Sequence, residues 1–111
     1  MTIIDKRKRV KVKITVVKRL NTDEILRDID PGCSANIDPV CGLFKEGQEF
    51  VTDMTTVPEG FCPGAFVDIF RYVSGLRSGA NYRWMNEEGK MLVCCTDGFR
   101  PVIFRLERMK D

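Results

Sequence analysis

The stretch MLVCCTDGFRPVIFRLERM, residues 91–109, decides the fold of this chain, because it has the pattern of a β-hairpin. Two apolar segments, 91–95 and 101–109, flank the sequence TDGFRP. An Asp-Gly step between two apolar runs is a strong hairpin signal. Cys94 and Cys95 come directly before this turn, so the hairpin also presents two adjacent thiols whose roles have to be separated.

Alternation along the hairpin places these two cysteines on opposite faces of the sheet. Neighbouring residues of a strand point to opposite sides. Val102 and Phe104 mark the apolar face of the second strand, and any turn with an even number of residues aligns Val93 and Cys95 with them. The sequence therefore predicts that Cys95 is buried as a small apolar side chain and that Cys94 is free for chemistry on the other face.

Working outward from the hairpin, the rest of the chain predicts a single α+β domain over residues 1–111. Residues 9–17 alternate apolar and polar positions, which is typical of a strand with one buried face. Together these segments predict a small, curled antiparallel sheet over one main helix. The expected elements are strands at 9–17, 48–54, 91–95 and 101–109, a short helix at 22–29, a long loop at 30–47 and the main helix at 63–77.

The main helix has a clear start. Pro63 suits the first helical position, which makes Cys62 the N-cap. A helix N-terminus stabilises an anion, so a thiol at this position is a stronger nucleophile candidate than a free cysteine. We therefore expect Cys62 to be the most reactive thiol of the chain.

Composition limits the classes of function. The chain has 111 residues, a formal net charge of +2 and no histidine, which excludes Ser-His and Cys-His catalysis and mixed Cys/His zinc sites. No apolar stretch reaches the roughly 20 residues that span a bilayer, and no secretion signal is present, so we expect a cytoplasmic protein without a membrane partner.

The basic run that includes Lys11 and Lys13 lacks interleaved aromatic residues, which argues against nucleic-acid binding and favours a solvated strand face.

Five cysteines in a reducing compartment indicate thiols or metal ligands rather than a disulfide framework. Cys33 and Cys41 lie in the long loop without the C-x-x-C spacing of zinc or thioredoxin-like sites. If the cysteines converge in space, an all-sulfur set would suit an iron–sulfur cluster, zinc or copper(I).

The motifs GQEF (47–50), PEGFC (58–62) and CCTDGFRPVIF (94–104) resemble a family of small prokaryotic proteins, about as long as this chain and common in anaerobes, that are conserved hypothetical proteins of unknown function. The resemblance implies a common fold and a shared thiol-lined site. The residues that match the cysteines of its pattern are Cys41, Cys62, Cys94 and Cys95, with Trp84 before the last hairpin. Cys33 is outside this pattern, and Gly64 and Phe66 stand where relatives tend to carry tryptophan.

Three functions compete on these grounds. In the first, Cys41, Cys62, Cys94 and Cys95 gather near the hairpin turn to bind a soft metal or to perform thiol redox chemistry. Asp97 and Arg100 would be the polar groups of that site. In the second, the chain is a noncatalytic accessory subunit or a homo-oligomer whose cysteines are packing residues. The third, nucleic-acid binding through the basic run, has the least support, and the sequence leaves open whether the protein is an enzyme.

Overall fold

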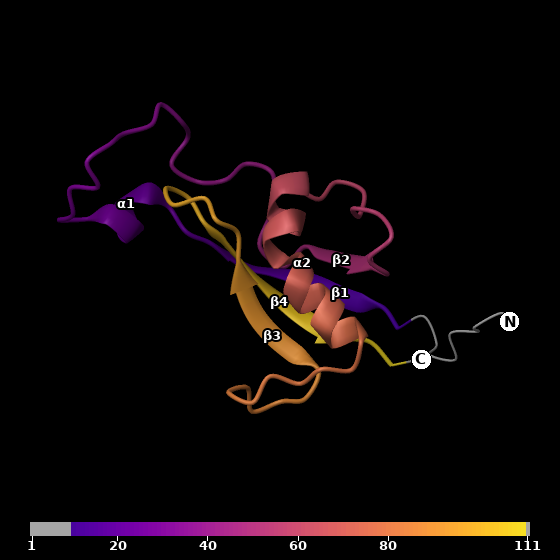
Figure 1. Cartoon of the computed structure of the whole chain (residues 1–111). Coiled ribbons are helices and arrows are strands. Elements are labelled where there is room, and N and C mark those ends of the chain that lie inside the picture. Colours follow the sequence, from indigo (N-terminus) through magenta and orange to yellow (C-terminus); the bar gives the residue numbers. More distant parts are fainter. Residues whose placement is uncertain (1–9, 111) are drawn as a thin grey trace, which may run out of the picture.

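Four strands form one antiparallel sheet in the order β2-β1-β4-β3 (Figure 1). The structure is a computed structural model, and it describes residues 10–110. The elements along the chain are β1 (Val12–Arg19), α1 (Thr22–Leu26), β2 (Glu49–Thr52), α2 (Pro63–Arg77), β3 (Lys90–Cys94) and β4 (Val102–Arg108). The α+β class, the antiparallel sheet and the single main helix are confirmed.

Strand β1 lies inside the sheet, between β2 and β4. Val12, Ile14 and Val16 are buried on its inner face, which confirms the predicted alternation. The alternation places Thr15 on the same solvated face as Lys11 and Lys13, but Thr15 is only 7% exposed because it lies between Glu49 of β2 and Arg105 of β4. The strand begins at Val12 and continues to Arg19, two residues past the predicted end at 17, and the predicted start, residue 9, lies outside the described residues.

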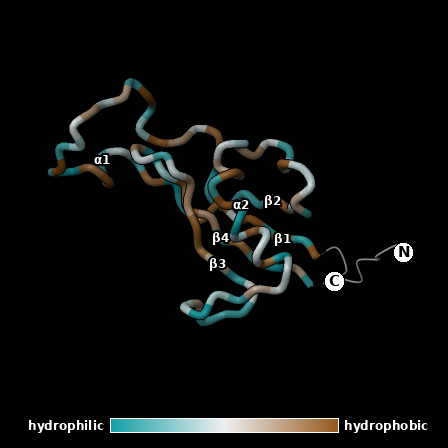
Figure 2. The backbone as a smooth tube through the Cα atoms, viewed as in Figure 1, coloured by the Kyte–Doolittle hydropathy of each residue, from teal (hydrophilic) through white to brown (hydrophobic). Residues whose placement is uncertain are grey.

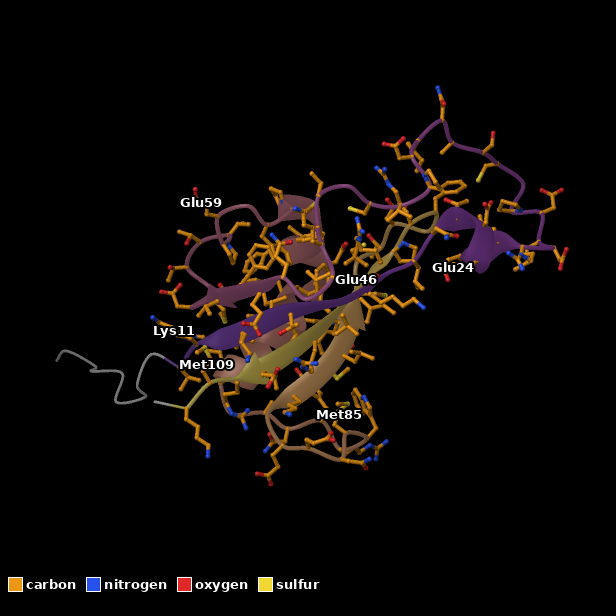
Figure 3. The ribbon with its side chains drawn as sticks, turned by 180° about the vertical axis from the view of Figure 1, so that it is seen from behind. Lys11, Glu24, Glu46, Glu59, Met85 and Met109 are labelled. Carbon is orange, nitrogen blue, oxygen red and sulfur yellow. The ribbon has the colours of Figure 1, made fainter. Side chains whose placement is uncertain are left out.

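Helix α2 packs against β1, β3 and β4 on one face of the sheet. Its bounds are those that the sequence predicts, since its apolar positions recur at helical spacing. The buried residues of α2 are Ala65, Phe66, Ile69, Val73 and Leu76. Figure 3 shows the sheet from behind, where neither described helix covers it, and where Lys11 and Met109 lie together at one end.

Arg108 ties the C-terminal end of α2 to the sheet. Its Nη1 donates to the carbonyl oxygens of Leu76 (3.0 Å) and Ala80 (2.8 Å), and its Nη2 donates to Oδ1 of Asn81 (2.8 Å). Carbonyl groups at a helix C-terminus lack partners within the helix, so a guanidinium there both caps the helix and fixes it on β4.

A cluster of aromatic rings fills the core between the sheet and the segments that lead into α2. The Phe44 ring lies 5.0 Å from the Phe61 ring and 5.2 Å from the Phe104 ring, centroid to centroid. Phe50 adds a fourth ring, 4.9 Å from Phe61. Figure 2 shows hydrophobic (brown) segments along the strands of the sheet. The long loop is therefore anchored in the core by Phe44, which is 2% exposed.

The short helix is shorter than the sequence predicts. Asn21 is its N-cap and forms a capping box with Glu24, but the helix ends at Leu26 rather than at residue 29. Asp28 has a φ of 62°, in the left-handed region, so the chain leaves the helix before that residue. Strand β2 is likewise shorter than expected and ends before Met54, whose φ is 78°.

The connection between β3 and β4 is longer than an Asp-Gly turn. The amide of Cys95 donates to the carbonyl oxygen of Val102 at 3.1 Å, so the loop holds the six residues 96–101. Six is an even number, and Val93 therefore pairs with Phe104 and Cys94 with Ile103 as the alternation requires. The turn prediction was too short, but the faces assigned to the two cysteines are confirmed: Cys94 is exposed and Cys95 packs against the core.

Candidate functional site: a cleft lined by three cysteines

An open cleft of about 310 Å³ lies where the end of the long loop, the start of α2 and the β3–β4 connection meet. Each of these three walls contributes one cysteine. Cys41 comes from the loop, Cys62 from the N-cap of α2 and Cys95 from the position directly after β3. The remaining lining residues are Leu43, Phe44, Gly64, Ala65, Asp68, Thr96, Asp97, Arg100 and Val102.

Cys62 occupies the N-cap position that the sequence predicts. It has an extended backbone, with φ −65° and ψ 121°, and its side chain makes no capping hydrogen bond. A Cβ atom placed on Gly64 would lie 3.8 Å from the Cys62 sulfur. The glycine therefore leaves space beside this thiol that a larger side chain would fill.

Cys95 is only partly buried, whereas the sequence predicts a buried residue. Cys95 is the last residue of its strand segment to pair across the hairpin, with Val102, and its side chain lines the open cleft instead of being enclosed by the core. Its sulfur accepts a hydrogen bond from the backbone N–H of Val102 at 3.3 Å. This bond keeps the thiol on the inner side of the hairpin.

Cys41 is held from the sheet side. The Nη1 atom of Arg19 donates to the Cys41 carbonyl oxygen at 3.1 Å, and the amide of Arg19 donates to Glu46 at 3.1 Å. A β-bulge between Val16 and Lys18 exchanges the two faces of the sheet to which successive residues of β1 point. Arg19 lies beyond this bulge and pairs with Val102 of β4. Spacing alone did not indicate this contact, because Arg19 is far from Cys41 in sequence.

The polar groups of the cleft are linked by hydrogen bonds within the β3–β4 connection. Asp97 accepts hydrogen bonds from the amides of Phe99 (3.0 Å) and Arg100 (3.2 Å) and from Nε of Arg100 (3.2 Å). Burial acts to raise the pKa of Asp97, but these hydrogen bonds and the charge of Arg100 outweigh it and hold the pKa below the usual value. The Asp97 carboxylate therefore fixes the loop beside Cys95.

Asp68 is a member of the cleft that the sequence did not indicate. Its Oδ2 atom accepts hydrogen bonds from the amide (2.9 Å) and the hydroxyl (3.0 Å) of Thr96. Its position on α2, six residues after Cys62, shows no pattern that could have identified it. With Asp68 and Asp97 opposite one arginine, Arg100, the ionised lining side chains carry a formal charge of −1 at neutral pH.

The structure brings together five of the seven residues that the sequence selected: Cys41, Cys62, Cys95, Asp97 and Arg100. Cys94 is exposed on the opposite face of the hairpin, and Trp84 is 62% exposed and packs at a tilt against Tyr82, with ring centroids 5.4 Å apart. Neither lines the cleft. Among residues 10–110, no group of three or more Cys, Asp, Glu or His side chains is arranged to hold a metal ion.

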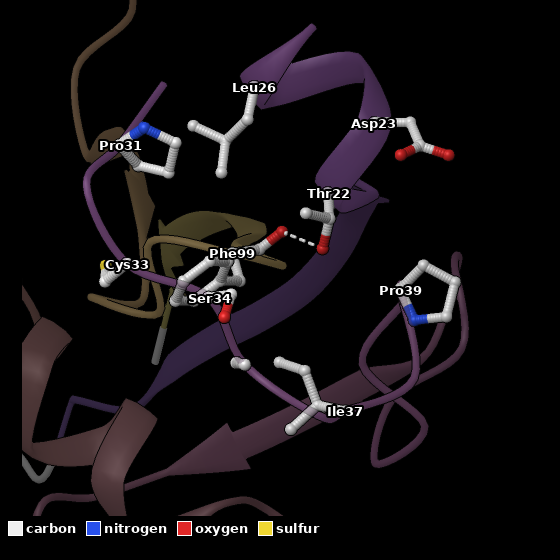
Figure 4. A pocket seen from close by; sticks show the side chains of 10 residues that line it. Thr22, Asp23, Leu26, Pro31, Cys33, Ser34, Ile37, Pro39 and Phe99 are labelled. Atoms are coloured by element: carbon white, nitrogen blue, oxygen red, sulfur yellow. Dashed lines mark hydrogen bonds between the residues drawn. The ribbon is translucent and has the colours of Figure 1, made fainter. Parts of the chain in front are cut away.

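A second cavity, of about 330 Å³, lies between α1 and the long loop (Figure 4). Leu26, Ile37 and Phe99 are among its apolar lining residues, and Cys33 lies at its wall. The hydroxyl of Thr22 donates to the Phe99 carbonyl oxygen at 2.7 Å and joins α1 to the hairpin connection. Cys33 is exposed there, apart from the three-cysteine cleft.

Comparisons with family models, with curated proteins and with solved structures give no match to this chain. The resemblance of its motifs to a family of small prokaryotic proteins therefore stays a prediction. Within the described part of the chain, none of the helices has the length and apolar character needed to cross a bilayer.

Proposed function

We propose that this protein performs thiol–disulfide chemistry in the cleft lined by Cys41, Cys62 and Cys95, in the reducing environment of the cytoplasm. The observation that carries the proposal is that three segments distant in sequence each place one partly buried cysteine on the same cleft. Packing alone does not require a thiol on every wall. The lack of a three-ligand arrangement in residues 10–110 favours redox chemistry over a soft-metal site.

The reaction would exchange two protein thiols for one disulfide. A cleft thiolate attacks one sulfur of a disulfide substrate, forms a mixed disulfide and releases the other half, which takes a proton from water. A second cleft thiolate then attacks the protein sulfur of the mixed disulfide and releases the remaining half. Two protein thiols lose two electrons and two protons, and the substrate gains them as two thiols.

A redox titration tests this proposal. Protein purified without oxygen is equilibrated in glutathione buffers, and its free thiols are counted after acid quenching. We expect the loss of two thiols with a midpoint between about −180 and −320 mV, the range of glutathione-buffered compartments. The matched control is Cys33→Ala/Cys94→Ala, which removes the two exposed cysteines and should titrate like the wild type.

Metal analysis of the same preparation separates the redox site from a soft-metal site. About one zinc, iron or copper per chain, lost on Cys62→Ala but retained in Cys33→Ala/Cys94→Ala, would contradict the redox proposal in favour of a metal centre. Metal-free protein with the expected titration would support it.

One observation favours the alternative of an accessory or oligomeric module. The three cleft cysteines also pack against the hydrophobic core. Val67 on α2 is 75% exposed in the single chain, and a partner chain would cover this apolar side chain. In that case the titration would show no two-electron step, and light scattering would report an assembly larger than one chain. Val67→Lys would then dissociate the assembly.

A further inference from the structure

The carboxylate of Asp68 connects the cysteine of the helix wall to the cysteine of the hairpin wall. It stands on the second turn of α2, which begins directly after Cys62, and it accepts both the amide and the hydroxyl of Thr96, the residue after Cys95. Two hydrogen bonds to one ionised carboxylate make a directional link. This link fixes the hairpin wall relative to the helix wall.

Cys41 is held by a different part of the molecule. Its carbonyl accepts from Arg19 of β1, so the contact orients the loop against the sheet rather than against α2. The Cys95 sulfur also has a fixed direction, because it accepts the Val102 N–H. Of the two thiols that could pair with Cys62, Cys95 is therefore the one whose position is set from the same helix.

Resting on the proposed function, we infer that Cys62 and Cys95 are the reacting pair and that Asp68 is the residue that positions them. Cys62 attacks the disulfide substrate and Cys95 resolves the mixed disulfide. In the second step the bond between the Cys62 sulfur and the substrate half breaks, the Cys62–Cys95 bond forms, and the released thiolate takes a proton from water. Asp68 exchanges no proton in this scheme.

The consequence is kinetic. Holding two reacting groups in place replaces an encounter by a unimolecular step, and a misplacement of about 1 Å can cost a hundredfold in rate. Without Asp68, the conversion of the mixed disulfide on Cys62 into the Cys62–Cys95 disulfide should slow by at least about tenfold. Direct attack on Cys62 by a small alkylating agent does not need Cys95, so its rate should not change.

The experiment uses the full chain carrying Cys33→Ala, Cys41→Ala and Cys94→Ala, which leaves only the inferred pair. Oxidised glutathione is added, and mass spectrometry of acid-quenched samples follows the conversion of the mixed disulfide into the internal disulfide. Asp68→Ala should slow this conversion, whereas Asp68→Asn, which keeps one acceptor oxygen, should recover part of it. Asp23→Ala, on the exposed first turn of α1, is the matched control.

The outcomes separate the inference from the proposed function. Equal closure rates in Asp68→Ala and its parent would overturn the positioning role. A wild-type disulfide that peptide mapping places between Cys41 and another cleft cysteine, and that does not form in the two-cysteine chain, would overturn the inference alone. No internal disulfide in either chain would overturn the function as well.

If the two-cysteine chain fails to fold, the pair is mapped in Cys33→Ser/Cys94→Ser, which retains all three cleft cysteines. A peptide that links Cys62 to Cys95 supports the inference, and one that links Cys62 to Cys41 overturns it.

Discussion

The three cleft cysteines differ in what holds each of them. Cys62 is placed by the start of a helix, Cys95 by a hydrogen bond to its own sulfur, and Cys41 by an arginine that binds its carbonyl group. A buried cysteine usually behaves as a small apolar side chain, so a cleft cysteine can contribute to packing as well as to the proposed chemistry. Replacing single sulfur atoms separates the two effects.

Cys95→Ser should destabilise the protein by about 1 kcal/mol, the lower end of the cost of a buried hydroxyl, because the Val102 N–H remains as a partner. Cys94→Ser is the matched control and should stay within about 0.5 kcal/mol, since Cys94 is exposed. Urea unfolding measures both. An equal loss for the two variants would contradict the assignment of the two faces.

Asp97 gives the fold a dependence on pH. Its pKa lies below the usual value, so its stabilising contribution is present above the unfolded-state pKa of about 4 and is lost as the pH falls through the folded-state value. Asp97→Asn should therefore be less stable than the wild type at pH 7, by no more than about 1 kcal/mol because the pair is partly exposed.

The difference in the free energy of unfolding between Asp97→Asn and the wild type should shrink in urea unfolding curves recorded below about pH 4. Part of the acid sensitivity should remain in Asp97→Asn, because a hydrogen bond from Arg105 also lowers the pKa of Glu107. A constant difference from pH 7 to pH 3 would show that the Asp97 carboxylate is not the source.

At the level of elements, α2 carries one wall of the cleft at its start and meets an aromatic group near its end. Gly75 lies under Tyr82, whose ring packs between Tyr72 and Trp84, with centroids 5.3 and 5.4 Å away. A Cβ atom at position 75 would collide with the Tyr82 hydroxyl. The glycine is thus required by a close approach, although glycine in a helix interior is unfavourable.

Gly75→Ala should destabilise α2 by about 1–3 kcal/mol through overpacking, despite the gain of up to about 1 kcal/mol in helix propensity. Gly75→Ala/Tyr82→Phe should recover most of the loss, because removing the hydroxyl leaves the ring carbon Cζ 3.4 Å from the new methyl group. Thermal unfolding compares the two variants with Tyr82→Phe alone. No recovery in the double variant would place the strain elsewhere.

How far the sequence predicts each element depends on whether its signal is local. The bounds of α2 follow from Pro63 and the apolar spacing, and the opposite facing of Cys94 and Cys95 follows from strand alternation. The roles of Phe44, Arg19 and Asp68 could not be predicted in this way, because their partners Phe61, Cys41 and Thr96 meet them only in the folded chain. The six-residue connection was missed because Asp-Gly alone resembles a complete turn.

For the whole molecule, the cleft depends on how the long loop is attached to the core. Phe44 comes three residues after Cys41 and contacts the rings of Phe50, Phe61 and Phe104. One side chain therefore joins the sheet, the segment before α2 and the loop. The core and the cleft share this residue, which also lines the cleft.

Phe44→Ala should cost about 3–5 kcal/mol, as the loss of a buried phenylalanine ring usually does. Because the ring anchors the loop, Cys41 should also become more reactive toward iodoacetamide than it is in the folded wild type. Leu43→Ala is the matched control, since Leu43 is 65% exposed beside the same cysteine. Unchanged Cys41 labelling in folded Phe44→Ala would show that the loop is held by other contacts.

The central claim, that the cleft cysteines form a redox site, is tested most directly by mapping the disulfide in the wild-type chain. The protein is oxidised with glutathione disulfide, quenched with acid, alkylated and digested, and the linked peptides are identified by mass spectrometry. We expect one internal disulfide that joins Cys62 to a second cleft cysteine, with Cys33 and Cys94 free. Linkage through Cys33 or Cys94, or no internal disulfide at all, would contradict the claim.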